Sequence, residues 1–162
     1  MEGEIRLDEV SVFGGKLSFL IPYEWEELES EADNVYVYSR PRTDSGWLRV
    51  SLNTSTVVAV TPSEKLKGIF EKRENASRDE QTGNLVHAYE RDSEEEGVKI
   101  HLYYWIVANA VEPNLVREAV FSYTVLSERI NDEETVATVG LLRQIVGQAN
   151  FNSETQRPDW RG

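Results

Sequence analysis

The side chains best suited to chemistry are His87 and His101, the two histidines of the chain. Imidazole nitrogens and carboxylate oxygens suit several divalent metal ions, so the two histidines and Glu118 could form a metal site. In the strand pairing that the sequence predicts, however, His87 lies opposite Tyr103, which leaves the two histidines diagonal to each other. No further ligand stands at a recognisable spacing, so the sequence predicts no metal and no cofactor.

A run of carboxylates between residues 24 and 33 raises the question of calcium binding. It consists of Glu24, Glu26, Glu27, Glu29, Glu31 and Asp33. These residues lack the Asp-x-Asp-x-Asp-Gly spacing that wraps oxygen ligands around an ion. The run therefore indicates a solvated loop or a short helix.

Signatures of nucleophilic catalysis are absent from the sequence. The chain has no Cys, which excludes a thiolate nucleophile, a disulfide framework and a zinc-thiolate site. It has no Gly-x-Ser-x-Gly motif, and a serine, a histidine base and an orienting acid would have to be brought together by the fold. We therefore expect a protein that is not an enzyme and has no catalytic residues.

The composition of the chain limits its partners. The 162 residues include 29 acidic and 17 basic side chains, which gives a formal net charge of −12. This charge repels phosphate backbones and anionic lipids, so we expect no nucleic acid and no membrane as a partner, and it would attract a basic protein. The length predicts one domain. Because no basic and apolar leader or membrane-spanning stretch is found, we expect a cytoplasmic protein.

The chain is organised around two apolar strands, residues 98–109 and 114–126, which are joined by a turn near Pro113. Side chains on a strand alternate between two faces, so a register that places Val111 opposite Asn114 gives one wholly apolar face. The pairs on that face are Tyr104 with Phe121, Leu102 with Tyr123 and Ile106 with Ala119. A register shifted by two residues would bury the same side. We therefore predict that the even-numbered side of the first strand faces the core.

The odd-numbered side of the same strand is aromatic and partly polar. Tyr and Trp combine a large apolar area with a polar group, and they are enriched in binding hot spots. We predict that this side binds a protein partner, unless one of the helices covers it. The predicted partner-binding residues are Tyr89, His101, Tyr103, Trp105 and Trp47.

Two helices are predicted from their capping residues. The segment Thr61-Pro62-Ser63-Glu64 has the N-cap, first-turn proline and Glu of a capping box. Asn131, with a Glu three residues later, predicts the cap of a last helix over residues 132–148. Both helices carry apolar stripes that should lie on a sheet.

The other segments predict strands and a short tail. Alternating apolar residues predict strands at residues 5–13, 16–21, 35–40, 47–58 and 85–92. The first two would form a hairpin at Gly14-Gly15, and the last would pair with the central strand to make a three-stranded meander. We expect one α+β domain, residues 1–151, followed by a polar tail, residues 152–162.

The segment that begins at Phe13 resembles the beginning of the PsbP-like superfamily. It contains, in order, Phe13-Gly14-Gly15, Leu17-Ser18-Phe19, Ile21-Pro22 and Trp25. The capped helix at Thr61, the meander and a final helix running into Ala149-Asn150-Phe151 fit the same pattern. This superfamily includes Mog-type Ran-binding factors, DcrB-like bacterial proteins and the effector-associated chaperones of type VI secretion.

The resemblance implies an antiparallel sheet of about six strands with helices packed on both faces, an α/β/α sandwich. It also implies binding or assembly instead of catalysis, although no functional residue of the superfamily maps onto this chain. We therefore expect a non-enzymatic cytoplasmic protein-binding module, a chaperone or adaptor, whose unidentified partner is a secreted effector or a basic protein. Three alternatives stay open: a small-molecule or lipid-binding protein, an immunity-type inhibitor of a toxin, and an enzyme of unrecognised class.

Overall fold

The computed structural model describes residues 6–30, 32, 34–40, 46–73, 76–111 and 113–151. Within these residues the elements follow the order β1 (Leu7–Val12), β2 (Leu17–Pro22), β3 (Glu26–Leu28), β4 (Val35–Ser39), β5 (Trp47–Thr56), α1 (Pro62–Glu71), β6 (Ala76–Arg78), β7 (Leu85–Glu95), β8 (Val98–Val111), β9 (Leu115–Leu126), a 3-10 turn (Ser127–Arg129), α2 (Glu133–Gly147) and β10 (Asn150–Phe151). The predicted tail after residue 151 lies outside the described residues.

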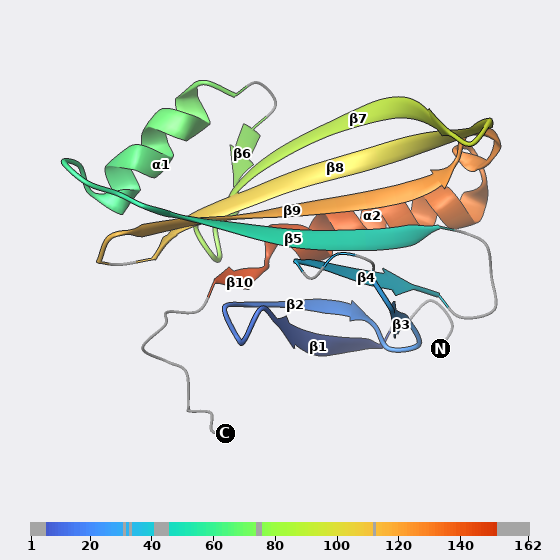
Figure 1. Cartoon of the computed structure of the whole chain (residues 1–162), viewed down its shortest axis with the longest axis horizontal. Helices are drawn as coiled ribbons and strands as arrows, with labels where there is room; N and C mark the ends of the chain where they lie inside the picture. The colour runs from blue at the N-terminus through green and yellow to red at the C-terminus, as the bar shows by residue number, and fades with distance from the viewer. Residues whose placement is uncertain are drawn as a thin grey trace.

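The strands form two antiparallel sheets (Figure 1). The large sheet has seven strands in the order β3-β4-β5-β9-β8-β7-β6, and the small sheet has three in the order β1-β2-β10. The α+β class and the β7-β8-β9 meander are confirmed. The predicted opening hairpin forms, although its turn comprises the four residues 13–16 and not Gly14-Gly15 alone. It pairs with β10 and does not join the large sheet.

The two helices pack on opposite faces of the large sheet. Val107 of β8 belongs to the main core beneath α2, whereas the next residue, Ala108, packs with Leu66 of α1. Consecutive residues of a strand point to opposite faces, so we name the two sides the α2 face and the α1 face. The small sheet shares the α2 face, where the rings of Phe19 and Phe121 have centroids 5.2 Å apart.

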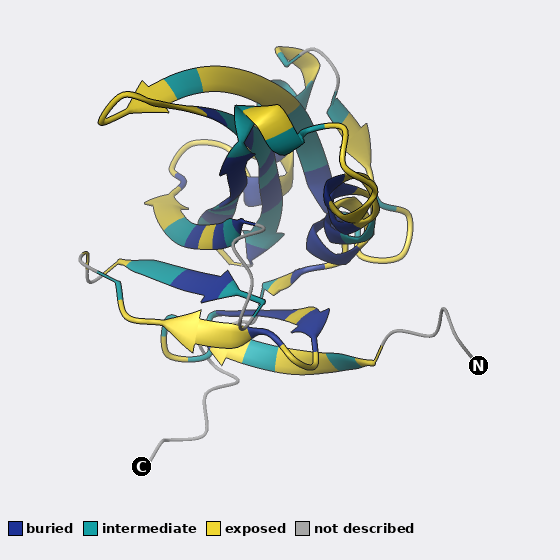
Figure 2. Ribbon diagram, turned by 90° about the vertical axis from the view of Figure 1, so that its right-hand side faces the viewer, coloured by how far each residue is buried: buried dark blue, intermediate teal, exposed yellow. Residues whose placement is uncertain are grey.

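Most of the buried residues lie between the large sheet, α2 and the small sheet, as the colouring of Figure 2 shows. A smaller cluster lies between α1 and the end of the large sheet where β8 and β9 are joined. Figure 1 shows the two helices near different ends of the sheet. Neither of them, in the part of the chain that the structure describes, is long and apolar enough to cross a membrane.

The capping residues explain where the helices begin. The Oγ1 of Thr61 accepts a hydrogen bond from the Glu64 N–H at 3.1 Å, and the Glu64 carboxylate accepts one from the Thr61 N–H at 3.1 Å, which confirms the capping box. The cap predicted at Asn131 is wrong by one residue. Asp132 is the N-cap of α2, without a side-chain cap hydrogen bond, and its charge is placed where the helix dipole favours an anion.

The predicted register of β8 on β9 is also wrong by one residue. Val111 pairs with Leu115 and not with Asn114, because the loop between the strands is one residue longer than assumed. A slip of one residue moves every side chain to the other face. The pairs under α2 are therefore Tyr103 with Tyr123, Trp105 with Phe121 and Val107 with Ala119. The odd-numbered side of β8, and not the even-numbered side, faces the main core.

The hairpin of β7 and β8 is longer than predicted. Its turn consists of Glu96 and Gly97 alone, both with positive φ angles, 53° and 82°. Two consecutive positive φ angles are typical of the tight turns whose twist matches that of the flanking strands. The strands therefore extend to Glu95 and Val98, which pair with each other. As a result, the hairpin extends further than predicted at the end near this turn, which we call its outer end.

Candidate functional site

Four of the five predicted partner-binding residues belong to the β7–β8 hairpin, but they do not share one face. His101, Tyr103 and Trp105 alternate along β8 on the α2 face. Tyr89 of β7 pairs with Tyr104, so it lies on the α1 face. The prediction that Tyr89 shares a face with His101 is wrong, because it assumed a longer turn between the strands.

Trp47, the fifth residue, lies elsewhere on the α1 face. It pairs with Thr124 of β9 and borders a hollow of about 480 Å³, together with Leu28 and Val37. The Arg49 guanidinium lies 5.6 Å from the centre of its indole ring. Trp47 is therefore a separate candidate and cannot act in one site with Tyr103.

The aromatic row on the α2 face is covered at one end only. Trp105 is 2% exposed and belongs to the main core, so the expectation that its side chain is accessible is wrong. Tyr103 and His101 are partly exposed. The ring centroids are 6.5 Å apart for Tyr103 and Trp105, and 4.8 Å apart for His101 and Tyr103. Buried Trp105 thus supports a tyrosine and a histidine that solvent can reach.

A cleft of about 360 Å³, which we call the aromatic cleft, lies beside this row. Its lining residues come from β7, β8 and α2, and are Ala88, Tyr89, Glu90, Tyr103, Tyr104, Trp105 and Arg143. Clefts of this volume suit a large side chain or a small ligand. Because Glu90 and Arg143 both line it, the cleft combines an aromatic wall with charges of both signs.

His101 bridges two carboxylates of β7. Its Nδ1 lies 2.7 Å from Asp92 Oδ1, and its Nε2 lies 2.8 Å from Glu90 Oε1. Both ring nitrogens must carry a proton to donate both bonds. Burial disfavours the charged ring, but the hydrogen bonds and negative charges of Asp92 and Glu90 outweigh it and raise the pKa of His101. The bridge therefore favours an imidazolium.

The hydroxyl group of Tyr103 is held in its neutral form. Burial, followed by the negative charge of Glu90, raises the pKa of Tyr103. A neutral phenol both donates and accepts hydrogen bonds. At neutral pH this side chain therefore offers a partner an aromatic ring and a hydrogen-bonding group.

The residues weighed for metal binding and acid–base chemistry do not converge. His87 lies beside Tyr89 on the α1 face, with ring centroids 5.4 Å apart, whereas His101 is on the α2 face. Glu118 forms a salt bridge with Arg73 at 2.9 Å. Among the described residues, no three histidines or carboxylates are placed to hold a metal ion. Both ring nitrogens of His101 lie within hydrogen-bonding distance of a carboxylate, an arrangement typical of an ion pair.

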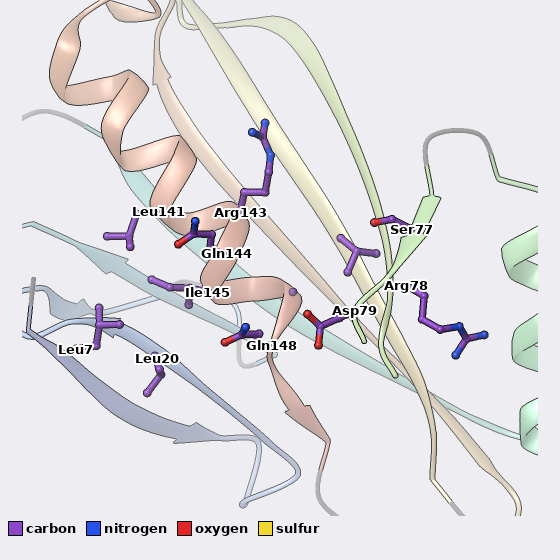
Figure 3. A pocket seen from close by; sticks show the side chains of 12 residues that line it. Leu7, Leu20, Ser77, Arg78, Asp79, Leu141, Arg143, Gln144, Ile145 and Gln148 are labelled. Carbon is purple, nitrogen blue, oxygen red and sulfur yellow. The ribbon is translucent and has the colours of Figure 1, made fainter. Parts of the chain in front are cut away.

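A second groove lies along the C-terminal half of α2 (Figure 3). This α2 groove has a volume of about 510 Å³ and lies between α2, the small sheet and the β6 edge of the large sheet. Leu7 and Leu20 border it from the small sheet, and Arg78 and Asp79 border it from the opposite side. Arg143 lines both hollows, so they form neighbouring parts of one surface.

The charged residues of the candidate site were not predicted from the sequence. The carboxylates of Glu90 and Asp92 recur with period two in a strand, so they share a face, and this signal was present in the sequence. Arg143 carried no comparable signal. Its contribution depends on how α2 crosses the sheet, which the helix pattern alone does not determine.

No protein-family model matches the sequence, and no curated protein sequence matches it either. Similarity is found among solved structures. A protein from Bacteroides thetaiotaomicron superposes with a TM-score of 0.61 and 16% identity over 91% of this chain and 49% of that one. The present chain thus spans about half the length of the Bacteroides protein.

Two further structures match over nearly their whole length. The Ran-binding protein Mog1p of Saccharomyces cerevisiae has a TM-score of 0.55 and 14% identity, over 94% of this chain and 98% of Mog1p. LpqN of Mycobacterium tuberculosis, a protein involved in cell envelope biogenesis, has a TM-score of 0.50 and 12% identity, with 92% of each chain covered. At these identities the likeness concerns the fold alone. The chain has the PsbP-like fold that the segment from Phe13 to Trp25 indicated.

Proposed function

We propose that this protein is a non-enzymatic protein-binding module, of the chaperone or adaptor type, whose binding surface is the aromatic cleft. The observation that supports the proposal most directly is the position of Tyr103. It lies partly exposed between Trp105, which is buried, and His101, which is held by two carboxylates. A ring fixed by its neighbours loses little conformational entropy when a partner binds.

The chemistry of the cleft suits a protein surface. Tyr and Arg are among the residue types enriched in binding hot spots, and the cleft has both in Tyr103 and Arg143. Glu90 adds an acceptor for basic groups. Solvent reaches the cleft at Tyr103, which is partly exposed, and at Glu90, which is exposed, so side chains of a large partner can enter it without a change in the fold.

The net charge and the fold are consistent with this function. The formal charge of −12 favours a basic partner, such as a basic effector protein or a basic toxin that the chain would inhibit. Mog1p, which shares the fold, is a Ran-binding protein. This likeness is an argument by analogy, because one fold can serve many functions.

A photo-crosslinking amino acid in place of Tyr103 tests the proposal in the cell of origin. We expect one protein to be crosslinked from this position. The matched control carries the same group in place of Tyr23, a tyrosine of the small-sheet end that is 54% exposed. Equal labelling from both positions, or no protein product from Tyr103, would contradict the proposed function.

The α2 groove supports a second candidate function, the binding of a small molecule or lipid. Its volume of about 510 Å³ is in the usual range of ligand sites, and Leu7 and Leu20 supply apolar contacts opposite Asp79. Native mass spectrometry of the protein purified from its own cell should then show an added mass of a few hundred daltons. Loss of that mass in Leu20→Arg, but not in Val98→Arg at the hairpin end, would favour this function.

A further inference from the structure

The outer part of β7 is an open edge of the large sheet. In the described chain, β6 pairs with β7 only from Leu85 to His87. The following residues of β7, Ala88–Glu95, pair with β8 on one side, and no described strand pairs with them on the other. Half of the backbone N–H and C=O groups along this segment therefore point to an edge that another strand could join.

The charged side chains along this edge are mostly negative. Ala88–Glu95 contains four carboxylates and one guanidinium. The even-numbered residues Glu90, Asp92 and Glu94 all point to the α2 face, and all three are exposed. Two of these carboxylates, Asp92 and Glu90, lie 2.7 Å and 2.8 Å from the ring nitrogens of His101. An incoming strand with basic residues at alternate positions would complement the row.

The aromatic cleft lies directly beside this edge. Ala88 and Glu90 belong both to the open segment and to the lining of the cleft. When a strand joins an edge, its backbone supplies affinity and its alternate side chains enter neighbouring pockets, which supply specificity. β6 shows that the β7 edge accepts an antiparallel strand at its inner end.

We infer that the β7 edge from Ala88 to Glu95 binds an extended, basic segment of a protein partner by strand addition, as an outward continuation of β6. This inference rests on the proposed protein-binding function and adds the chemistry of the partner. A second copy of this chain does not fit the edge. Two such edges side by side would bring Glu90, Asp92 and Glu94 against the same carboxylates of the other copy.

The test uses the full chain and a synthetic peptide with alternating Lys and Val, about seven residues long. Amide chemical shifts of the isotope-labelled protein should change along Ala88–Glu95 on titration with this peptide. A second peptide carries N-methyl groups at alternate residues on its edge-facing side, which blocks backbone hydrogen bonds while keeping the charge. We expect it to bind at least about tenfold more weakly.

Matched variants separate this edge from general attraction to an acidic protein. Glu94→Gln combined with Glu95→Gln removes two charges from the edge without touching the His101 bridge. Glu26→Gln combined with Glu27→Gln removes two exposed charges from β3, the opposite edge of the same sheet. We expect the first pair to weaken peptide binding several-fold more than the second at low salt.

Three results would overturn the inference: equal binding of the methylated peptide, equal loss in both variant pairs, or shift changes that avoid β7. These results are distinguishable from failure of the proposed function. If crosslinking from the Tyr103 position captures a partner while the peptide leaves β7 unchanged, the binding function stands and strand addition is wrong.

Discussion

The inner and outer halves of the β7–β8 hairpin differ on the α2 face, although the same two strands form both. In the inner half, Trp105 and Val107 are 2% and 0% exposed beneath α2. In the outer half, the side chains of Glu90 and Asp92 are 56% and 84% exposed, and they enclose His101. The alternation of side chains continues unbroken, so the path of α2 across the sheet and the residue types decide which half is core and which is surface.

We expect the inner half of the hairpin to contribute mainly to stability and the outer half mainly to binding. Burial of apolar area dominates the free energy of folding, so the inner half should carry most of the stability. Exposed charges contribute little to folding but determine the charge of a partner. Substitutions in the two halves should therefore affect different measurements.

The largest effect is expected for Trp105→Ala in the inner half. Removing a fully buried indole ring leaves a cavity under α2, and we expect a loss of roughly 3–5 kcal/mol in the free energy of unfolding. Urea unfolding followed by circular dichroism measures the change. Tyr103→Ala, two residues away on the same strand and face, is the control and should cost less than about 2 kcal/mol, because its side chain is partly exposed. Similar losses for both would contradict the division of the hairpin.

The next effect concerns Asn84, which precedes the inner half. Its buried Nδ2 group donates to the carbonyl oxygens of Gly147 at 3.1 Å and Ala149 at 2.6 Å, joining the end of α2 to β7. Asn84→Ala leaves these acceptors unpaired, so we expect a loss of about 1–3 kcal/mol in the free energy of unfolding. Gln81→Ala in the same loop, an exposed residue, should cost less than about 0.5 kcal/mol. Equal midpoints in urea would contradict this role of Asn84.

Much of the fold could be predicted from local chemistry. The capping box at Thr61, the Gly14-Gly15 hairpin and the meander all depend on residues close in sequence. The registers could not be predicted in the same way. They depend on how many residues form the turns at Glu96-Gly97 and after Val111, and a difference of one residue exchanges the two faces.

For the same reason, only part of the geometry of the candidate site could be predicted from the sequence. Tyr103 and His101 were recognised from their residue types, and the structure places both on one partly open surface. Trp105 was recognised from its type too, but its burial depends on the path of α2 across the sheet. The spacing of Glu90 and Asp92 indicates that they share a face, but their position around His101 follows only from the correct register, which pairs Asp92 with His101.

A smaller, pH-dependent effect is expected for His101. The pKa of His101 is raised in the folded protein above the usual 6.5, so the proton that it holds stabilises the fold. This contribution is complete below about pH 6.5 and is lost as the pH rises through the folded-state value. The difference in unfolding free energy between the wild type and His101→Gln should therefore be larger at pH 6 than at pH 8.

Urea unfolding at a series of pH values measures this difference, and His87→Gln serves as the control because it leaves the bridge to Asp92 and Glu90 intact. Tyr103 contacts the imidazole ring, and Arg143 lines the cleft together with Glu90, so a substitution at either residue would change the surroundings of His101. Both residues therefore stay as in the wild type in this experiment. If the pH dependence of stability were the same in His101→Gln and the wild type, the raised pKa would be wrong.

The smallest effect on stability is expected for Glu94→Gln at the outer end of β7. Glu94 is exposed and pairs across the hairpin with Lys99, also exposed, so its charge is largely screened by solvent. We expect the free energy of unfolding to change by less than about 0.5 kcal/mol. Binding of the alternating Lys-Val peptide should nevertheless weaken, because the charge lies along the open edge. A variant with normal stability and weaker binding would show that the outer half contributes to binding without contributing to folding. A loss of stability without a change in binding would assign the outer half to folding instead.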